Sequence, residues 1–97
     1  MSAYRLKPRA KRDLDEIWIY SKAKWGPRRA LAYLRDIEAT IMMIARNPDL
    51  GPINDALPDG YRQRSAGSHL VFYRRRDGFI EVVRILHRNV DFDSHLP

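Results

Sequence analysis

The sequence predicts an α+β domain in which a helical hairpin packs on a small twisted antiparallel sheet, in the order β-α-α-β-β-β. Apolar residues recur every three or four positions through residues 9–46, which is typical of amphipathic helices. They alternate with polar residues through most of residues 61–87, which is typical of strands. A chain of 97 residues has room for one hydrophobic core, so residues 1–97 are expected to form a single domain.

The first half of the chain is predicted to hold one strand and both helices. A short strand over residues 3–7 alternates apolar with charged side chains and ends at Pro8. A first helix over residues 9–24 carries its apolar side chains on one face. Gly26 suits the left-handed backbone that ends a helix, and the proline after it suits the first turn of the next. The second helix therefore covers residues 27–46.

The second half is predicted to hold one long loop and two hairpins. Residues 47–60 are rich in proline, glycine, asparagine and aspartate and are expected to form the loop. Strands are expected over residues 61–66, 69–75 and 79–87, separated by short turns that contain glycine. The last strand is apolar on nearly both faces, which suits a central or covered position. The tail over residues 89–97 is expected to be irregular or a short helical turn.

The basic composition points to an acidic partner. The formal net charge is +6, the pI is near 10.1, and arginine supplies fourteen of the eighteen basic residues. Arginine binds phosphates and carboxylates bidentately, so nucleic acid, an acidic protein surface and an acidic peptide tail all fit. With no cysteine and three scattered histidines, neither a metal nor a cofactor is expected. Because the chain lacks a signal peptide and any bilayer-length apolar run, we expect a cytoplasmic protein with no membrane partner.

Several short motifs occur in an order that is fairly specific as a set. The N-terminal half contains Ala10-x-x-Asp13-Leu14-x-x-Ile17-x-x-Tyr20, then Trp25-Gly26 with Ala30 and Tyr33, then Asn47-Pro48-x-x-Gly51. The C-terminal half adds Gly60-x-Arg62, Gly67-Ser68-His69-Leu70-Val71-Phe72-Tyr73-Arg74 and Val83-Arg84-Ile85-Leu86-His87-Arg88. With these motifs the chain resembles the ParE branch of the RelE/ParE toxin superfamily, from Tyr4 to about Leu96.

The resemblance implies a toxin of a type II toxin–antitoxin system that a ParD-like antitoxin neutralises. ParE-like toxins are known as poisons of DNA gyrase, whereas RelE-like relatives cut mRNA in the ribosomal A site. On the first mechanism the chain is an inhibitor rather than an enzyme, and it meets nucleic acid only through its target or its antitoxin. A third hypothesis is that the chain is a non-toxic basic nucleic-acid-binding module, and only the charge supports it.

The residue types favour gyrase poisoning over RNA cleavage. A metal-free ribonuclease must activate the 2′-OH, neutralise the phosphate and protonate the leaving oxygen. RelE-like nucleases carry lysines and arginines around the second helix and sheet, but here all four lysines lie before residue 25. The C-terminal tail has no tyrosine, and Arg88 follows His87 where some nuclease relatives have a His-Tyr pair.

A set of basic and aromatic residues on the strands is predicted to bind the target. Arg62 and Arg64 lie two residues apart on one face of a strand, so neighbouring arginines extend them into a basic patch. Arg84 is the sharpest candidate, because apolar neighbours would not surround a charge without reason. The predicted target-binding residues are Arg62, Arg64, Tyr73, Arg74, Arg84, His87 and Arg88. If the chain is a nuclease, the catalytic candidates are Arg62, Arg84 and His87.

A second set, of apolar residues, is predicted to bind the antitoxin. One small core is not expected to cover every large apolar side chain of two helices and a sheet. A disordered antitoxin segment that folds on binding would cover the remainder, and its acidic residues would meet the arginines. The predicted antitoxin-binding residues are Leu14, Ile17, Trp18, Leu70, Phe72 and Ile80.

Overall fold

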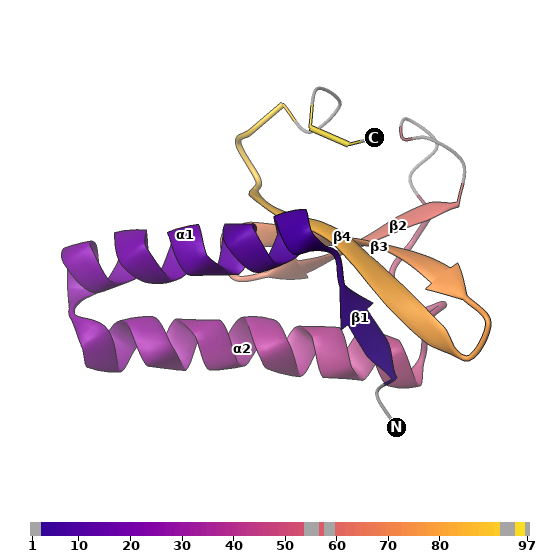
Figure 1. The fold of residues 1–97 in the computed structure, drawn as a ribbon, viewed down its shortest axis with the longest axis horizontal. Helices are drawn as coiled ribbons and strands as arrows, with labels where there is room; N and C mark the ends of the chain where they lie inside the picture. Colours follow the sequence, from indigo (N-terminus) through magenta and orange to yellow (C-terminus); the bar gives the residue numbers. More distant parts are fainter. Residues whose placement is uncertain (1–2, 54–56, 58–59, 92–94, 97) are drawn as a thin grey trace.

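A computed structural model of the chain has the predicted order of elements, with two antiparallel helices lying beside a four-stranded sheet (Figure 1). It describes residues 3–53, 57, 60–91 and 95–96. In chain order the elements are β1 (Tyr4–Leu6), α1 (Pro8–Trp25), α2 (Pro27–Arg46), β2 (Tyr61–Ala66), β3 (His69–Arg76) and β4 (Phe79–His87). Their bounds lie within a residue of the predicted ones at every end, because proline, glycine and the change of period mark each boundary.

The sheet has the strand order β1-β4-β3-β2 and is mixed rather than antiparallel. Strands β2, β3 and β4 pair antiparallel through short turns, as predicted. The expectation of an entirely antiparallel sheet is wrong at one edge, where β1 pairs parallel to β4, with Tyr4 opposite Ile80. No turn joins β1 to β4, so hairpin geometry does not set their relative direction. Backbone bonds from Ile80 N to Ala3 O (3.1 Å) and from Lys7 N to Val82 O (3.0 Å) extend this pairing at both ends.

Proline and glycine place the ends of both helices. Pro8 occupies the first turn of α1, where its missing N–H costs no hydrogen bond. At the other end Gly26 has φ of +88° and donates its N–H to Lys22 O at 2.9 Å. Pro27 then begins α2 directly, so the two helices form a hairpin with a one-residue link. Neither helix of the described chain is long and apolar enough to span a membrane.

The core lies between the helical hairpin and one face of the sheet. From α2, Ile37, Ile41 and Ile44 are buried there against side chains of the sheet such as Val71 and Val82. A second, smaller apolar cluster contains Leu57, Tyr61, Phe72, Val83 and Leu86, with Leu70 and Leu96 packed against it. The alternation of side chains along β3 and β4 puts this second cluster on the opposite face, here called the outer face.

The loop after α2 is fastened to the sheet by a buried tyrosine. The Tyr73 hydroxyl donates to Pro48 O at 2.8 Å and accepts the N–H of Gly51 at 3.0 Å. A Cβ at position 51 would lie 2.5 Å from the Tyr73 hydroxyl oxygen, so only glycine allows this approach. Ile53 of the loop also forms an isolated antiparallel β-bridge with Arg62 on β2. The long loop is therefore ordered against the sheet where it leaves α2.

A buried ion pair joins α1 to β4. Asp13 on α1 accepts hydrogen bonds from Arg84 Nε at 2.8 Å and Arg84 Nη2 at 3.0 Å, and from the Ile85 N–H at 2.9 Å. Asp13 and Arg84 are only 4% and 6% exposed. Arg84 also donates from Nη1 to His95 O at 3.0 Å, which brings the C-terminal segment to the same point. The Asp13–Arg84 pair thus connects helix, strand and tail.

We expect Asp13→Ala to lower the free energy of unfolding by about 3–5 kcal/mol, because it leaves the Arg84 guanidinium buried without a counter-charge. Urea denaturation followed by circular dichroism measures the change. Asp13→Asn keeps the shape and one acceptor oxygen and should lose less.

Asp15→Ala provides the matched control, because Asp15 is an exposed residue of the same helix. It should change the free energy of unfolding by no more than about 0.5 kcal/mol. Equal losses for the alanine variants at positions 13 and 15 would contradict a specific role of the buried pair.

Candidate functional site

The register of the sheet divides the predicted basic patch between two faces. Arg62 lies opposite Tyr73, and Arg64 lies opposite Val71, both of which belong to the core under the helices. Directly opposed residues share a face, so these two arginines lie on the helix side of the edge strand β2. Arg74 lies opposite Tyr61, which belongs to the cluster on the outer face. The expected single patch is therefore wrong, because the chain alternates faces between Tyr73 and Arg74.

An edge cluster gathers around Asp49 in the loop after α2. Arg62 Nη2 lies 3.3 Å and Arg75 Nη1 3.2 Å from the same oxygen of Asp49. Arg62 also donates to Gly51 O at 2.8 Å, so its guanidinium helps to hold the loop. Tyr73 has no exposed surface, and burial raises the pKa of its hydroxyl. Arg62 and Tyr73 thus both hold the loop against the sheet. Because Tyr73 is fully buried, the prediction that it belongs to the target-binding surface is wrong.

The outer face carries a second basic cluster around Glu81. Arg74 Nη2 lies 3.4 Å and Arg76 Nη2 3.2 Å from the Glu81 Oε1 atom. The Arg74 guanidinium also stacks over the Tyr61 ring, 4.8 Å from its centroid. Burial raises the pKa of Tyr61, whose hydroxyl has no hydrogen-bond partner in the described parts of the chain. Arg74 is the only predicted target-binding arginine that the structure places in this cluster.

The prediction that Arg84 belongs to the target-binding surface is also wrong, because its side chain is buried. Its guanidinium is occupied by Asp13 and by the His95 carbonyl, inside the protein. The predicted nuclease set of Arg62, Arg84 and His87 is therefore not assembled as a site: Arg62 holds a loop, and Arg84 fastens a helix. The reason for a charge among apolar neighbours is structural, and its partner lies 71 residues away along the chain.

A groove with a volume of about 510 Å³ lies between α1 and the C-terminal end of β4. We call it the hairpin groove. Its lining includes Ile17, Tyr20, Trp25, Tyr33, His69 and His87. Tyr20 and Trp25 are 62% and 37% exposed, so the groove presents large aromatic side chains to solvent. Asp13 and Arg84 also line it, and their ion pair joins its two sides.

Aromatic rings in contact form one wall of the hairpin groove. The Trp25 and Tyr33 ring centroids are 6.1 Å apart, those of Tyr33 and His69 are 5.6 Å apart, and those of His69 and His87 are 5.4 Å apart. The Tyr33 hydroxyl lies 2.6 Å from His69 Nδ1 and accepts the Ser68 N–H at 3.0 Å. The wall therefore runs from the tip of the helical hairpin to the end of the sheet.

The two histidines of this wall have different surroundings. Burial lowers the pKa of His69, and the neighbouring His87 lowers it further, while Asp13 acts in the opposite direction. The lowered pKa favours the uncharged imidazole, whose Nδ1 can accept a hydrogen bond from the Tyr33 hydroxyl. His87 Nδ1 accepts the Asn89 N–H at 3.1 Å. Arg88 lies beside this wall and donates to Gly67 O at 3.0 Å.

The predicted antitoxin-binding residues fall into four groups. Phe72 and Ile80 are fully buried, so the expectation that they remain uncovered is wrong. Ile17 is largely buried but lines the hairpin groove. Leu14 lines a separate, smaller cavity of about 290 Å³. The remaining members, Trp18 and Leu70, are half-buried.

Sequence reasoning missed the most exposed apolar residues of α1. Ile19 is 66% exposed, and Tyr20 and Trp25 carry the aromatic surface of the hairpin groove. The available signal was the position of Ile19 and Tyr20 off the buried stripe of the helix, since large apolar side chains on a wet face suggest an interaction. Among the described residues, no three histidine, aspartate or glutamate side chains are grouped to hold a metal ion.

The lowered pKa of His69 predicts a loss of stability on mild acidification. Its folded-state pKa lies below the ordinary value of 6.5, so the unfolded chain binds more protons as the pH falls below that value. The free energy of unfolding should therefore fall with pH from about 6.5 downward. His69→Gln should flatten this dependence in urea titrations at several pH values. His95→Gln, which replaces an exposed histidine, should leave it as it is in the wild type, and a dependence unaffected by His69→Gln would refute the assignment.

The comparisons with known proteins agree with this fold. The family described as ParE toxin of type II toxin-antitoxin system, parDE, matches residues 4–92. Toxin ParE1 of Caulobacter vibrioides is 46% identical over 96 residues, and Toxin ParE1 of Mycobacterium tuberculosis is 44% identical over 96 residues, with at least 98% of each chain covered. A solved structure described as the chromosomal ParDE TA system from P. aeruginosa shares the fold, with a TM-score of 0.77 at 21% identity over 90% of this chain and 96% of that chain. The chain belongs to the ParE toxin family of type II toxin–antitoxin systems.

Proposed function

We propose that this ParE-family toxin inhibits growth by binding and poisoning DNA gyrase, and that a ParD-like antitoxin neutralises it. The main support is family membership over nearly the whole chain, together with a preformed aromatic groove that suits a macromolecular partner. The relatives bear the name Toxin ParE1, and the family description names the parDE system. Both parts of the proposal follow the usual behaviour of this toxin class.

The engagement of the arginines supports inhibition rather than RNA cleavage. A ribonuclease needs cations that are free to neutralise the phosphate in the transition state. Arg84 is buried on Asp13, and Arg62 holds Asp49 and the Gly51 carbonyl. Neither guanidinium can turn to a phosphate without giving up a contact that fastens the fold. This supports a docking surface over a phosphodiester-cleaving site.

One observation favours ribosome-dependent mRNA cleavage as the second candidate. The Tyr33 hydroxyl, His69 and His87 lie in contact along an open groove, and an uncharged imidazole is a competent general base. Arg88 and Lys24 are exposed near the same groove. The wall therefore has residue types that acid–base chemistry uses, but His69 Nδ1 is already engaged with the Tyr33 hydroxyl, 2.6 Å away.

We expect the purified toxin, freed of antitoxin, to block DNA supercoiling by gyrase and to accumulate cleaved DNA complexes. Prior addition of the antitoxin should prevent both effects. Normal supercoiling at toxin concentrations that arrest growth would exclude gyrase as the target. The nuclease candidate makes the opposite forecast: mRNA would be cut on programmed ribosomes, and His69→Ala with His87→Ala would abolish the cut.

The hairpin groove supplies the antitoxin-binding surface in this proposal. Tyr20 and Trp25 expose aromatic area at its rim, and Lys24 adds positive charge beside them. An amphipathic antitoxin segment with acidic residues would bury the rings and pair with the lysine. Buried aromatic anchors of this kind contribute a large share of the binding free energy at protein interfaces.

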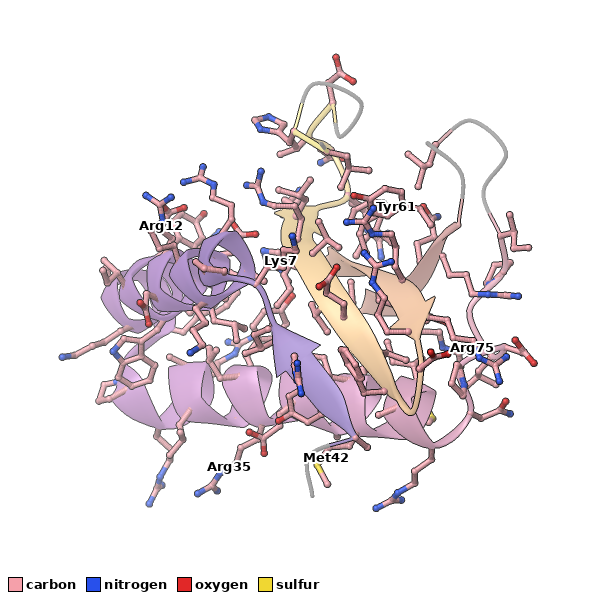
Figure 2. All side chains as sticks on the ribbon, turned by 45° about the vertical axis from the view of Figure 1, so that its right-hand side comes forward. Lys7, Arg12, Arg35, Met42, Tyr61 and Arg75 are labelled. Carbon is pink, nitrogen blue, oxygen red and sulfur yellow. The ribbon has the colours of Figure 1, made fainter. Side chains whose placement is uncertain are left out.

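Replacing Tyr20 and Trp25 together by alanine should weaken binding of the ParD-like antitoxin by about 30-fold or more, because the two anchors together are expected to contribute about 2 kcal/mol or more. Isothermal titration calorimetry measures the dissociation constant. Met42→Ala is the matched control, since Met42, labelled in Figure 2, is an exposed apolar residue on α2 that does not line the groove. An unchanged dissociation constant for the double variant would remove the groove as the antitoxin site.

A further inference from the structure

One residue from each strand forms a charged row across the outer face of the sheet. Arg5 on β1 lies opposite Glu81 on β4, Glu81 lies opposite Arg74 on β3, and Arg74 lies opposite Tyr61 on β2. Arg76 lies two residues along β3 and therefore on the same face. We call Arg5, Tyr61, Arg74, Arg76 and Glu81 the basic row.

The basic row carries more positive charge than its own carboxylate can balance. Glu81 Oε1 is within ion-pair distance of both Arg74 (3.4 Å) and Arg76 (3.2 Å). Arg5 is exposed and has no ion pair among the residues that the structure describes. Two guanidinium groups thus share the Glu81 carboxylate and that of Arg5 has no ion pair, which leaves capacity for carboxylates from another molecule.

Aromatic rings hold two of these guanidinium groups in place. Arg5 lies over the Phe79 ring, 4.4 Å from its centroid, and Arg74 lies over Tyr61 at 4.8 Å. A stacked guanidinium keeps its N–H edges free for bidentate hydrogen bonds and loses less side-chain entropy on binding. Two buried polar atoms of the row, Tyr61 Oη and Arg74 Nε, have no hydrogen-bond partner among the described residues.

We propose that the basic row is a second docking surface, which binds an acidic peptide segment of a partner protein through carboxylates paired with Arg5 and Arg76. The position of Glu81 among the arginines favours a peptide over a nucleic-acid strand, because a continuous phosphate backbone would meet its negative charge. The carboxylate of Asp77, exposed in the adjoining turn, would also repel a phosphate backbone that extended past the row. The surface lies on the opposite side of the sheet from the helices and does not depend on gyrase being the target.

Fluorescence anisotropy with a labelled oligoglutamate peptide at low ionic strength tests this surface. The double variant Arg5→Gln with Arg76→Gln should bind about tenfold more weakly than the wild type, since it removes two charge-assisted contacts at exposed positions. Glu81→Gln should bind more tightly, because it frees Arg74 and Arg76 from an internal competitor. Thermal unfolding of each variant checks that the fold is retained.

The matched control is Arg12→Gln with Arg35→Gln, which removes the same charge from the exposed helix surface, on the far side from Tyr61 (Figure 2). It should change the affinity for oligoglutamate by less than about twofold. Equal weakening by both double variants would mean that net charge alone attracts the peptide and would overturn the proposal. Tighter binding of an oligothymidine strand of equal length, lost in the Arg5 and Arg76 double variant, would overturn it in favour of nucleic acid.

Discussion

The buried Asp13 carboxylate is the constraint on which the arrangement of helix, strand and tail depends. It accepts three hydrogen bonds, two from Arg84 and one from the Ile85 N–H. A buried ion pair adds little net stability compared with well-packed apolar residues, but breaking it by removing one partner is costly. Its value is directional, because a carboxylate bonded to both a side chain and a backbone N–H fixes how α1 lies along β4. Apolar packing alone would allow the helix to slide.

Fixing α1 also shapes the hairpin groove. Asp13 and Arg84 line it at one end, while the Tyr33 hydroxyl, bonded to Ser68 N and close to His69 Nδ1, joins α2 to the β2–β3 turn at the other. These polar connections hold the walls in place without a bound partner. A groove that is already formed costs less conformational entropy on binding, which favours tight association with a partner that must itself fold.

The helices and strands could be predicted from the sequence. How the strands pair, and on which face of the sheet each arginine lies, could not. Proline, glycine and periodicity mark every boundary, so the order of elements could be predicted. The parallel pairing of β1 could not, because three residues without a connecting turn carry no signal of direction. The faces of Arg62 and Arg74 depend on the register between β2 and β3. The partner of Arg84 lies 71 residues away, and no local pattern identifies it.

The placement of the arginines, more than their number, determines what a net charge of +6 means. Asp13, Asp49 and Glu81 together bind five of the fourteen arginines, one of them inside the protein. Each phosphate that a free cation neutralises adds to the affinity for nucleic acid. An arginine that is already paired with a carboxylate contributes less to that affinity. The basic strands are therefore weaker evidence for nucleic-acid binding than composition suggests. Small, separate basic clusters next to aromatic rings instead suit short acidic segments of protein partners.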